Sequence, residues 1–344
     1  MTYNSTGEQV AVWAQFWLET VSILPLGALG LVGNCFALLT LRRPTLKTTF
    51  HQSLVSLAIC DVMFLFMILT DQIIDKTSLF YVILFPYFWN PVMNILVSSQ
   101  TFMIMGIATE RFLVVWMPVI YKIRRPSYSQ KTHLIFYILP PVLCSIFINI
   151  PKFMETEIIK ANMTDENNIT VEVLDYDITK IRFNKDYIFY YTHLTRLIFT
   201  GVLPFIYLAI VNSLIILVIK KKIPSYSSFK QRSRSSSQLP LEIRRNTVDK
   251  IDTQKFSTNT SISLIVIDVI FFVCHFPRLL LNFTEQKIIE DDIQIFLGEE
   301  GWLQFFLSLN VFSLTFNSSV NCLIYFLLWK KFKNVINKIF IFKT

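Results

Sequence analysis

The chain has few charged side chains and few histidines for its length. Asp, Glu, Lys and Arg make up 16% of the 344 residues, and the four histidines are His51, His133, His193 and His275. These histidines do not have the spacing of metal ligands, and no nucleophile and base form an evident pair, so the sequence does not indicate an enzyme. A hydrophobic content of 53% and a mean hydropathy of +0.49 indicate a membrane protein instead.

Charge is almost absent from seven stretches of the chain. A helix needs roughly 20 residues to cross the hydrocarbon core. We therefore predict an all-α membrane protein, a seven-transmembrane helix bundle over 20–329. The expected spans are about 20–41, 52–70, 88–115, 132–151, 197–219, 256–277 and 303–328. The apolar run at 77–109 is too long for one crossing, so we interpret 77–87 as an extracellular connection.

Lys and Arg are unequally divided between the two sides of this bundle. The segments on the N-terminal side hold 9 basic and 18 acidic residues, whereas the opposite segments hold 23 and 4. Cytoplasmic segments retain positive charge during insertion, so we expect a multi-pass plasma-membrane protein with residues 1–19 outside the cell. The membrane orientation then accounts for the net positive charge of the chain, so no nucleic-acid partner is required to explain it. With no signal-like start, the first span is expected to direct insertion.

Glycosylation motifs agree with this orientation. Asn4, Asn162 and Asn168 begin Asn-x-Ser/Thr triplets in segments predicted to be extracellular. All five cysteines lie within predicted spans, so we expect no extracellular disulfide. They are Cys35, Cys60, Cys144, Cys274 and Cys322.

Two cytosolic segments have distinctive compositions. Residues 220–255 form a basic, Ser-rich third cytosolic loop, which we interpret as mobile chain. Its candidate phosphorylation sites, beside arginines, are Ser233, Ser235, Ser236, Ser237 and Thr247. Residues 330–344 alternate Lys with apolar side chains at helical spacing, which predicts a short amphipathic helix on the inner membrane surface.

A few polar side chains fall inside the predicted spans, where they are costly. Asp61 is the clearest, and the polar residues predicted to surround it are Asn34, Gln100, Asn317, Ser318 and Asn321. One interpretation is that amides and hydroxyls satisfy one carboxylate structurally. The other is a hydrated cluster that could hold a structural sodium ion; no other cofactor is expected. Asp268 is expected to hydrogen-bond within its own helix or, alternatively, to pair with Arg111.

Three motifs give the chain a family resemblance. Glu110-Arg111-Phe112 is similar to the D/E-R-Y motif of the rhodopsin-like (class A) G protein-coupled receptors, and Asn321 to Tyr325 to their N-P-x-x-Y motif. Phe271 to Pro277 is similar to F-x-x-C-W-x-P, with His275 in place of Trp. Within the family, three segments most resemble the invertebrate FMRFamide-type neuropeptide receptors. They are Ile150 to Glu155, Cys274 to Pro277, and Asn317 to Asn321 continuing to Lys330-Lys331-Phe332-Lys333.

The resemblance implies a function and a set of residues. The implied G-protein coupling and activation residues are Glu110, Arg111, Phe112, His275, Pro277, Asn321 and Tyr325. The candidate ligand-binding residues are Asp71, Met93, His193, Arg196, His275 and Arg278. The family usually has a disulfide at the outer end of the third helix, but this chain has Pro86 there, which leaves open how the second extracellular loop is held.

We therefore expect a receptor that binds an extracellular ligand, an RFamide-like neuropeptide, and activates a heterotrimeric G protein. A cationic peptide suits the acidic outer surface, and Asp71 is the expected partner of a ligand arginine. Arg196 and Arg278 would instead suit a small acidic molecule, so a chemosensory receptor is the alternative, or they could pair with Asp71 or Glu155. A membrane transporter is a distant alternative.

Overall fold

The computed structural model describes residues 6–43, 49–118, 120–121, 130–164, 170–235, 264–282 and 300–328. Most of these residues are helical. The α-helices are α1 (Thr6–Ala14), α2 (Ile23–Leu41), α3 (Thr49–Ile73), α4 (Leu79–Leu84), α5 (Asn90–Trp116), α7 (Gln130–Asn149), α8 (Lys185–Tyr187), α9 (Leu203–Ser235), the unlabelled helix Leu264–Asn282, and α12 (Glu300–Leu328). Short 3-10 segments are η4 (Ile150–Met154) and η5 (Lys180–Phe183), and π-helical segments are η1 (Gln15–Val21), η3 (Phe85–Trp89) and η6 (Ile188–Val202).

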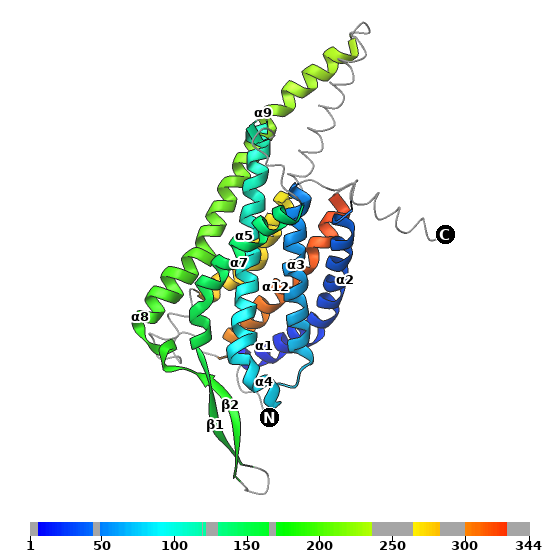
Figure 1. Ribbon diagram of the computed structural model, residues 1–344. Helices are drawn as coiled ribbons and strands as arrows, with labels where there is room; N and C mark the ends of the chain where they lie inside the picture. Colours follow the sequence, from blue (N-terminus) through cyan, green and yellow to red (C-terminus); the bar gives the residue numbers. More distant parts are fainter. Residues whose placement is uncertain are drawn as a thin grey trace, which may run out of the picture.

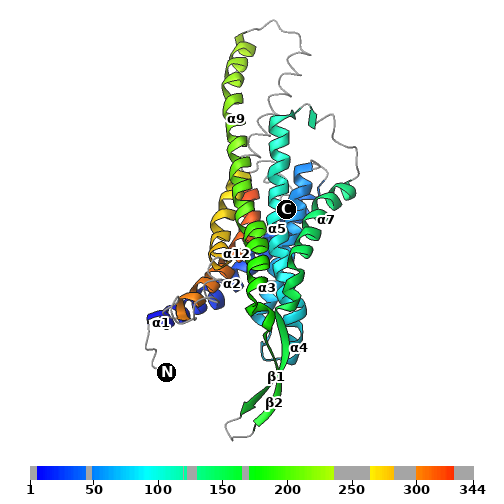
Figure 2. The same ribbon diagram turned by 90° about the vertical axis from the view of Figure 1, so that its left-hand side faces the viewer.

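The long helices form the predicted seven-helix bundle. Among the described residues, six helices are long and apolar enough to cross a membrane, and Ile138–Met154 is a shorter apolar helix. The helices run side by side, with a β-hairpin at one end and the extension of α9 at the other (Figures 1 and 2). We call these the hairpin end and the α9 end. The fold class predicted from the sequence is thus confirmed.

Prolines mark the points where three of these helices depart from α geometry. The π-helical segment η1 ends shortly before Pro25, η3 contains Pro86 and is followed by Pro91, and η6 ends just before Pro204. Proline lacks the N–H that continues the regular ladder, so the backbone changes its hydrogen-bond spacing there. In η6 the side chain of Thr195 donates to the carbonyl oxygen of Tyr190, five residues earlier, at 2.8 Å.

Small residues allow α2 and α12 to approach closely. A Cβ added to Gly30 would lie 2.7 Å from the backbone Cα of Ser319, and the Ser319 hydroxyl donates to the Leu26 carbonyl at 3.1 Å. Close packing of this kind holds helices together in lipid, where the hydrophobic effect gives no net attraction between them. Large apolar side chains such as Phe147 and Leu29 point outward, as a bilayer partner requires.

The second extracellular loop of the sequence prediction folds as a hairpin. Strands β1 (Thr156–Thr164) and β2 (Thr170–Ile178) pair antiparallel, with Thr156 opposite Ile178. The hairpin projects beyond the helix ends instead of lying across the bundle (Figures 1 and 2). Asn162, a predicted glycosylation site, is exposed on β1, whereas Asn4 and Asn168 lie outside the described residues.

Four predicted boundaries were wrong. The first helix begins before residue 20, as Gln9–Leu41, and the fifth begins before residue 197, as Lys185–Lys221. The segment 77–87, expected to be an irregular connection before the third span, is largely helical, because α4 begins at Leu79. The Ser78 hydroxyl caps this helix by accepting from the Tyr81 backbone N–H at 3.3 Å. The first part of the third cytosolic loop is not irregular chain either, because α9 continues to Ser235. Its Lys, Arg and Gln residues are good helix formers.

Several predictions fall on parts of the chain that the structure does not describe. They include the side chains of Ser233 and Ser235, the residues Ser236, Ser237 and Thr247, the start of the sixth span at 256–263, and the amphipathic helix at 330–344. These stay predictions.

Candidate functional site

The buried carboxylate of Asp61 lies at the centre of a polar cluster between α3, α5 and α12. Its Oδ1 accepts a hydrogen bond from Gln100 Nε2 at 2.9 Å, and its Oδ2 accepts one from Asn321 Nδ2 at 2.8 Å. Gln100 Nε2 also lies 3.1 Å from the Ser318 hydroxyl oxygen. The structure therefore brings together four of the residues predicted to form this cluster, from three different helices.

Asn34 extends the cluster to α2. Its Nδ2 donates to the carbonyl oxygens of Gly30, at 2.9 Å, and Ser318, at 2.8 Å, and so joins the first helix to the seventh. Asn317 is buried in the same turn of α12, but among the described contacts it has no hydrogen bond to Asp61.

These contacts bear on the predicted sodium ion. Both Asp61 oxygens receive amide N–H groups, which are donors and cannot ligate a cation. The side chains as arranged therefore fit a carboxylate that amides satisfy directly, and a sodium site would require the amides to turn their oxygens inward. A bound sodium ion stays a prediction.

Glu110 and Arg111, near the α9 end of α5, form a buried ion pair. Arg111 Nη2 lies 3.2 Å from Glu110 Oε1, and both residues are at most 6% exposed. The other Glu110 oxygen accepts from the Ser53 hydroxyl at 3.1 Å, and Tyr121 donates its hydroxyl to Oε1 at 2.9 Å. Glu110 therefore joins three segments of the chain at this end.

Phe50 provides a second partner for Arg111 that the sequence did not reveal. The guanidinium carbon lies 3.9 Å from the centroid of the Phe50 ring, within the range of a cation–π interaction. Phe112 points elsewhere and packs against Trp116, with ring centroids 5.0 Å apart. Arg111 is thus held between a carboxylate and an aromatic face.

Asp268 has neither of the two partners predicted for it. It is fully buried, and no ion pair connects it with Arg111 within the described part of the chain. The group that stabilises its charge is Asn212 of α9, although neither Asp268 oxygen has a hydrogen bond of ordinary length among the described residues. The expected bond within its own helix was wrong because the carboxylate faces the neighbouring helix.

The other predicted activation residues lie in the interior of the bundle. His275 is 3% exposed, and its ring centroid lies 4.0 Å from that of Phe271, one turn earlier. Pro277 is also buried, and Tyr325 is fully enclosed in an apolar cluster that includes Phe271. The structure therefore places these motif residues along one packed core between the hairpin end and the α9 end.

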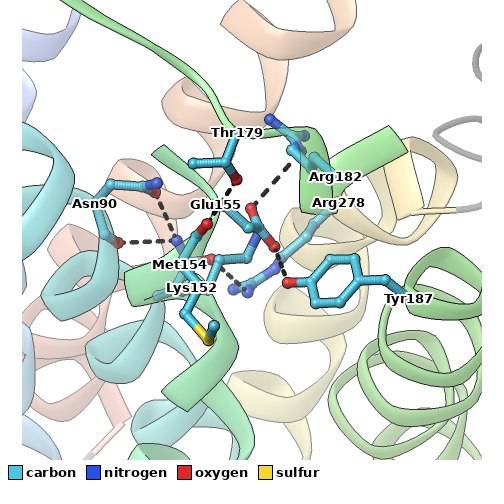
Figure 3. A network of polar contacts seen from close by, with 9 residues as sticks. Asn90, Lys152, Met154, Glu155, Thr179, Arg182, Tyr187 and Arg278 are labelled. Carbon is cyan, nitrogen blue, oxygen red and sulfur yellow. Dashed lines mark hydrogen bonds and ion pairs between the residues drawn. The ribbon is translucent and has the colours of Figure 1, made fainter. Parts of the chain in front are cut away.

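At the hairpin end, Glu155 is the centre of a second buried ionic network (Figure 3). Its Oε2 pairs with Lys152 Nζ and lies 3.7 Å from Arg182 Nε, and its Oε1 accepts from the Tyr187 hydroxyl at 2.9 Å. Glu155 also receives the Thr179 backbone N–H at its carbonyl oxygen, at 3.0 Å. The network thereby ties both ends of the hairpin to the start of the fifth helix.

Three of the predicted ligand-binding residues lie close to this network. Arg278 extends toward Lys152 and Glu155 (Figure 3), and its Nη2 lies 3.4 Å from Asn94 Oδ1. The guanidinium of Arg196 is near enough for the two positive charges to repel each other. The positive charge of Arg278 likewise opposes a positive charge on the His275 ring.

The other three predicted ligand-binding residues have different surroundings. His193 is partly buried, and its Nδ1 lies 3.1 Å from the Ile188 carbonyl oxygen. Met93 packs against an apolar cluster that contains Trp89 and Leu96. His193 is therefore engaged within its own helix, whereas Met93 packs between helices, because the cluster also includes Phe64 and Leu314.

Asp71, the expected partner of a ligand arginine, belongs to a separate group of contacts. Its Oδ1 accepts from the Tyr81 hydroxyl at 2.9 Å, and its Oδ2 lies 3.7 Å from Lys76 Nζ. The charge of Asp71 also acts on Tyr176 of the hairpin: burial first, then Asp175 and Asp71, raise the pKa of the Tyr176 phenol. Asp71 thus contributes to holding the outer end of the third helix.

Tyr176 anchors the hairpin where the family usually has a disulfide. Its ring centroid lies 4.5 Å from that of Phe85 and 6.5 Å from that of Tyr81. Phe85 directly precedes Pro86, the residue aligned with the usual cysteine, and the described cysteines are all free. Aromatic packing and the Glu155 network therefore hold the loop without a covalent bond.

Sequence reasoning missed most of this hairpin-end site. The 150–155 segment was noted as part of a family resemblance, and Glu155 as a possible partner of Arg196 or Arg278. The i, i+3 spacing of Lys152 and Glu155 was a further usable signal for an ion pair. Arg182, Tyr176 and Tyr187 gave no such signal, because their partners are distant in the sequence.

The fold and these sites define a seven-helix membrane protein with a buried glutamate–arginine pair at the α9 end and a buried ionic network at the hairpin end. The chain belongs to the family described as 7 transmembrane receptor (rhodopsin family), which matches residues 33–325. This confirms the resemblance inferred from the motifs, and with it a multi-pass membrane protein of the G protein-coupled receptor class.

Three curated proteins illustrate its relationships. The chain is 27% identical to the FMRFamide receptor of Drosophila melanogaster over 95% of its own length and 54% of that protein. It is 26% identical to Mas-related G-protein coupled receptor member A1 of Mus musculus over 41% of this chain and 46% of the relative. Member X2 of Trachypithecus francoisi is 34% identical over 31% of this chain and 33% of the relative. The matched region therefore covers about half the length of the FMRFamide receptor and less than half the length of the other two relatives.

Proposed function

We propose that this receptor responds to an extracellular amidated peptide ending in Arg-Phe and activates a heterotrimeric G protein. One observation carries the ligand class: the similarity to the FMRFamide receptor extends over 95% of the chain. In this proposal the hairpin end is extracellular and the α9 end faces the cytosol of the plasma membrane. The excess of Lys and Arg in the segments next to the α9 end supports that orientation.

The contacts of Arg111 support the signalling half of the proposal. The arginine is buried and held by Glu110 and Phe50 at the end of the bundle assigned to the cytosol. A G protein that inserts at this end would compete for the guanidinium and stabilise the released state. Ligand binding at the hairpin end favours the same state through the packed core of Phe271, His275 and Tyr325.

The test is a second-messenger assay on cells that express the chain. Amidated peptides ending in Arg-Phe are compared with the same peptides as free acids and with small carboxylic acids. The proposal predicts responses to the amidated peptides that are absent from untransfected cells. A response to small carboxylic acids alone would replace the peptide receptor with the chemosensory alternative, and no response to any peptide would remove the proposed ligand class.

A further inference from the structure

Among the described residues, buried basic side chains outnumber buried acidic ones at the hairpin end. We define the cationic cluster as Lys152, Arg196 and Arg278, which are 4%, 8% and 8% exposed, together with Arg182 at its edge. Glu155, 2% exposed, is the carboxylate that pairs with members of this cluster. Burial of a charge is costly unless an opposite charge or strong hydrogen bonds compensate it.

Both oxygens of Glu155 are already engaged. Lys152 and Arg182 share Oε2, and the Tyr187 hydroxyl occupies Oε1. Within the described contacts, the Glu155 carboxylate is thus already shared by two cations. Its charge also has a structural task, because these contacts attach the hairpin to the helices.

Arg278 is the member of the cluster with the weakest compensation. Among the described residues it forms no ion pair, and its contact with the neutral Asn94 amide is long, at 3.4 Å. The positive charge of Arg196 acts on it unfavourably. The neighbouring His275 is also buried, and its Nε2 has no hydrogen-bond partner within the described residues.

We propose that the cationic cluster binds a carboxylate of the ligand, with Arg278 as the main contact. The inference rests on the proposed function and deepens it: the peptide carries an acidic side chain in addition to its amidated Arg-Phe end. A guanidinium binds a carboxylate through two parallel hydrogen bonds, and an added negative charge would relieve the repulsion between Arg196 and Arg278.

The two ends of such a ligand would meet opposite charges. The segments assigned to the outside hold 9 basic and 18 acidic residues, so the surface attracts a cationic peptide. The buried cluster then selects, among cationic peptides, those with an acidic side chain. Attraction and selection are thus performed by different groups of residues.

The experiment compares amidated Arg-Phe peptides that carry either aspartate or asparagine at each upstream position. At one position the aspartate peptide is expected to be at least about tenfold more potent on the wild-type receptor, because hydrogen bonds to charged groups exceed neutral ones. Arg278→Gln should abolish that difference, and Arg278→Lys should restore part of it. Lys160→Gln, which removes an exposed cation of β1 outside the cationic cluster, is the matched control and should preserve the difference. Surface density of each variant is measured to exclude misfolding.

Free glutarate separates the two possible sources of the carboxylate. If Arg278 binds only a peptide side chain, glutarate alone should neither activate the receptor nor raise the thermal stability of the purified protein. Activation by glutarate that Arg278→Gln abolishes would overturn the peptide as the source. Equal potency of all aspartate and asparagine pairs, with normal responses to amidated peptides, would overturn this inference and leave the proposed function intact. If no peptide acts, the proposed function fails separately.

Discussion

Neutralising Glu110 should raise ligand-independent signalling. In Glu110→Gln the contacts to Arg111, Ser53 and Tyr121 lose a charged acceptor, while the cation–π contact between Arg111 and Phe50 remains. Removing one member of a buried ion pair costs about 3–5 kcal/mol when the other charge stays buried. Release of Arg111 toward the cytosol avoids that cost, so the substitution favours the released state.

The expected magnitude follows from the resting equilibrium. A minor state a few kcal/mol above the resting state is populated at about 0.1–10%. If about 1.4 kcal/mol of the lost interaction distinguishes the two states, the released fraction rises about tenfold. Basal signalling should therefore rise about tenfold, with a ceiling at the maximal response to ligand.

The assay is nucleotide exchange on the G protein without ligand, at matched receptor surface density. Tyr121→Phe is the graded comparison, because it removes one neutral hydroxyl donor from Glu110 and should cost only about 0.5–1.5 kcal/mol. It should raise basal exchange by less than Glu110→Gln does. Unchanged basal exchange in Glu110→Gln, with a normal response to ligand, would refute the idea that Glu110 restrains Arg111.

Three further outcomes are expected. Arg111→Ala should abolish G-protein activation while surface expression stays near that of the wild type. Normal signalling by this variant would show that Arg111 contributes only to the orientation of the chain in the membrane. Reducing agent should leave the melting temperature unchanged, because the described cysteines are free, and a disulfide found by mass spectrometry would contradict this. Gly30→Ala should lower the melting temperature by several degrees, because the new Cβ would lie 2.7 Å from the Ser319 backbone; Gly106→Ala, which meets nothing within 4 Å, is the matched control.

The sequence was sufficient to predict the bundle because lipid imposes a simple rule. Each span must be long, apolar and helical, so the spans can be recognised without knowledge of their partners. Buried polar residues are equally visible, which is why Asp61 and Asn321 could be selected in advance, whereas Glu110 was selected through its motif. Their contacts confirm that they lie in polar clusters, although the sequence did not establish which atoms would meet.

The hairpin end was less predictable because its contacts join distant segments. In β2, the consecutive apolar residues Val173 and Leu174 interrupt the alternation of apolar and polar residues that indicates a strand. The anchoring of Tyr176 against Phe85 depends on a register that no local pattern specifies. Asp268 was mispredicted for the same reason, since its neighbour Asn212 lies on another helix.

The most direct test of the receptor account uses purified components. The receptor is reconstituted in lipid with a panel of purified heterotrimeric G proteins, and nucleotide exchange is measured with and without an amidated Arg-Phe peptide. The account predicts that the peptide accelerates exchange on at least one G protein with the wild-type receptor and not with Arg111→Ala. Exchange that no such peptide accelerates on any G protein, or equal acceleration with Arg111→Ala, would contradict it.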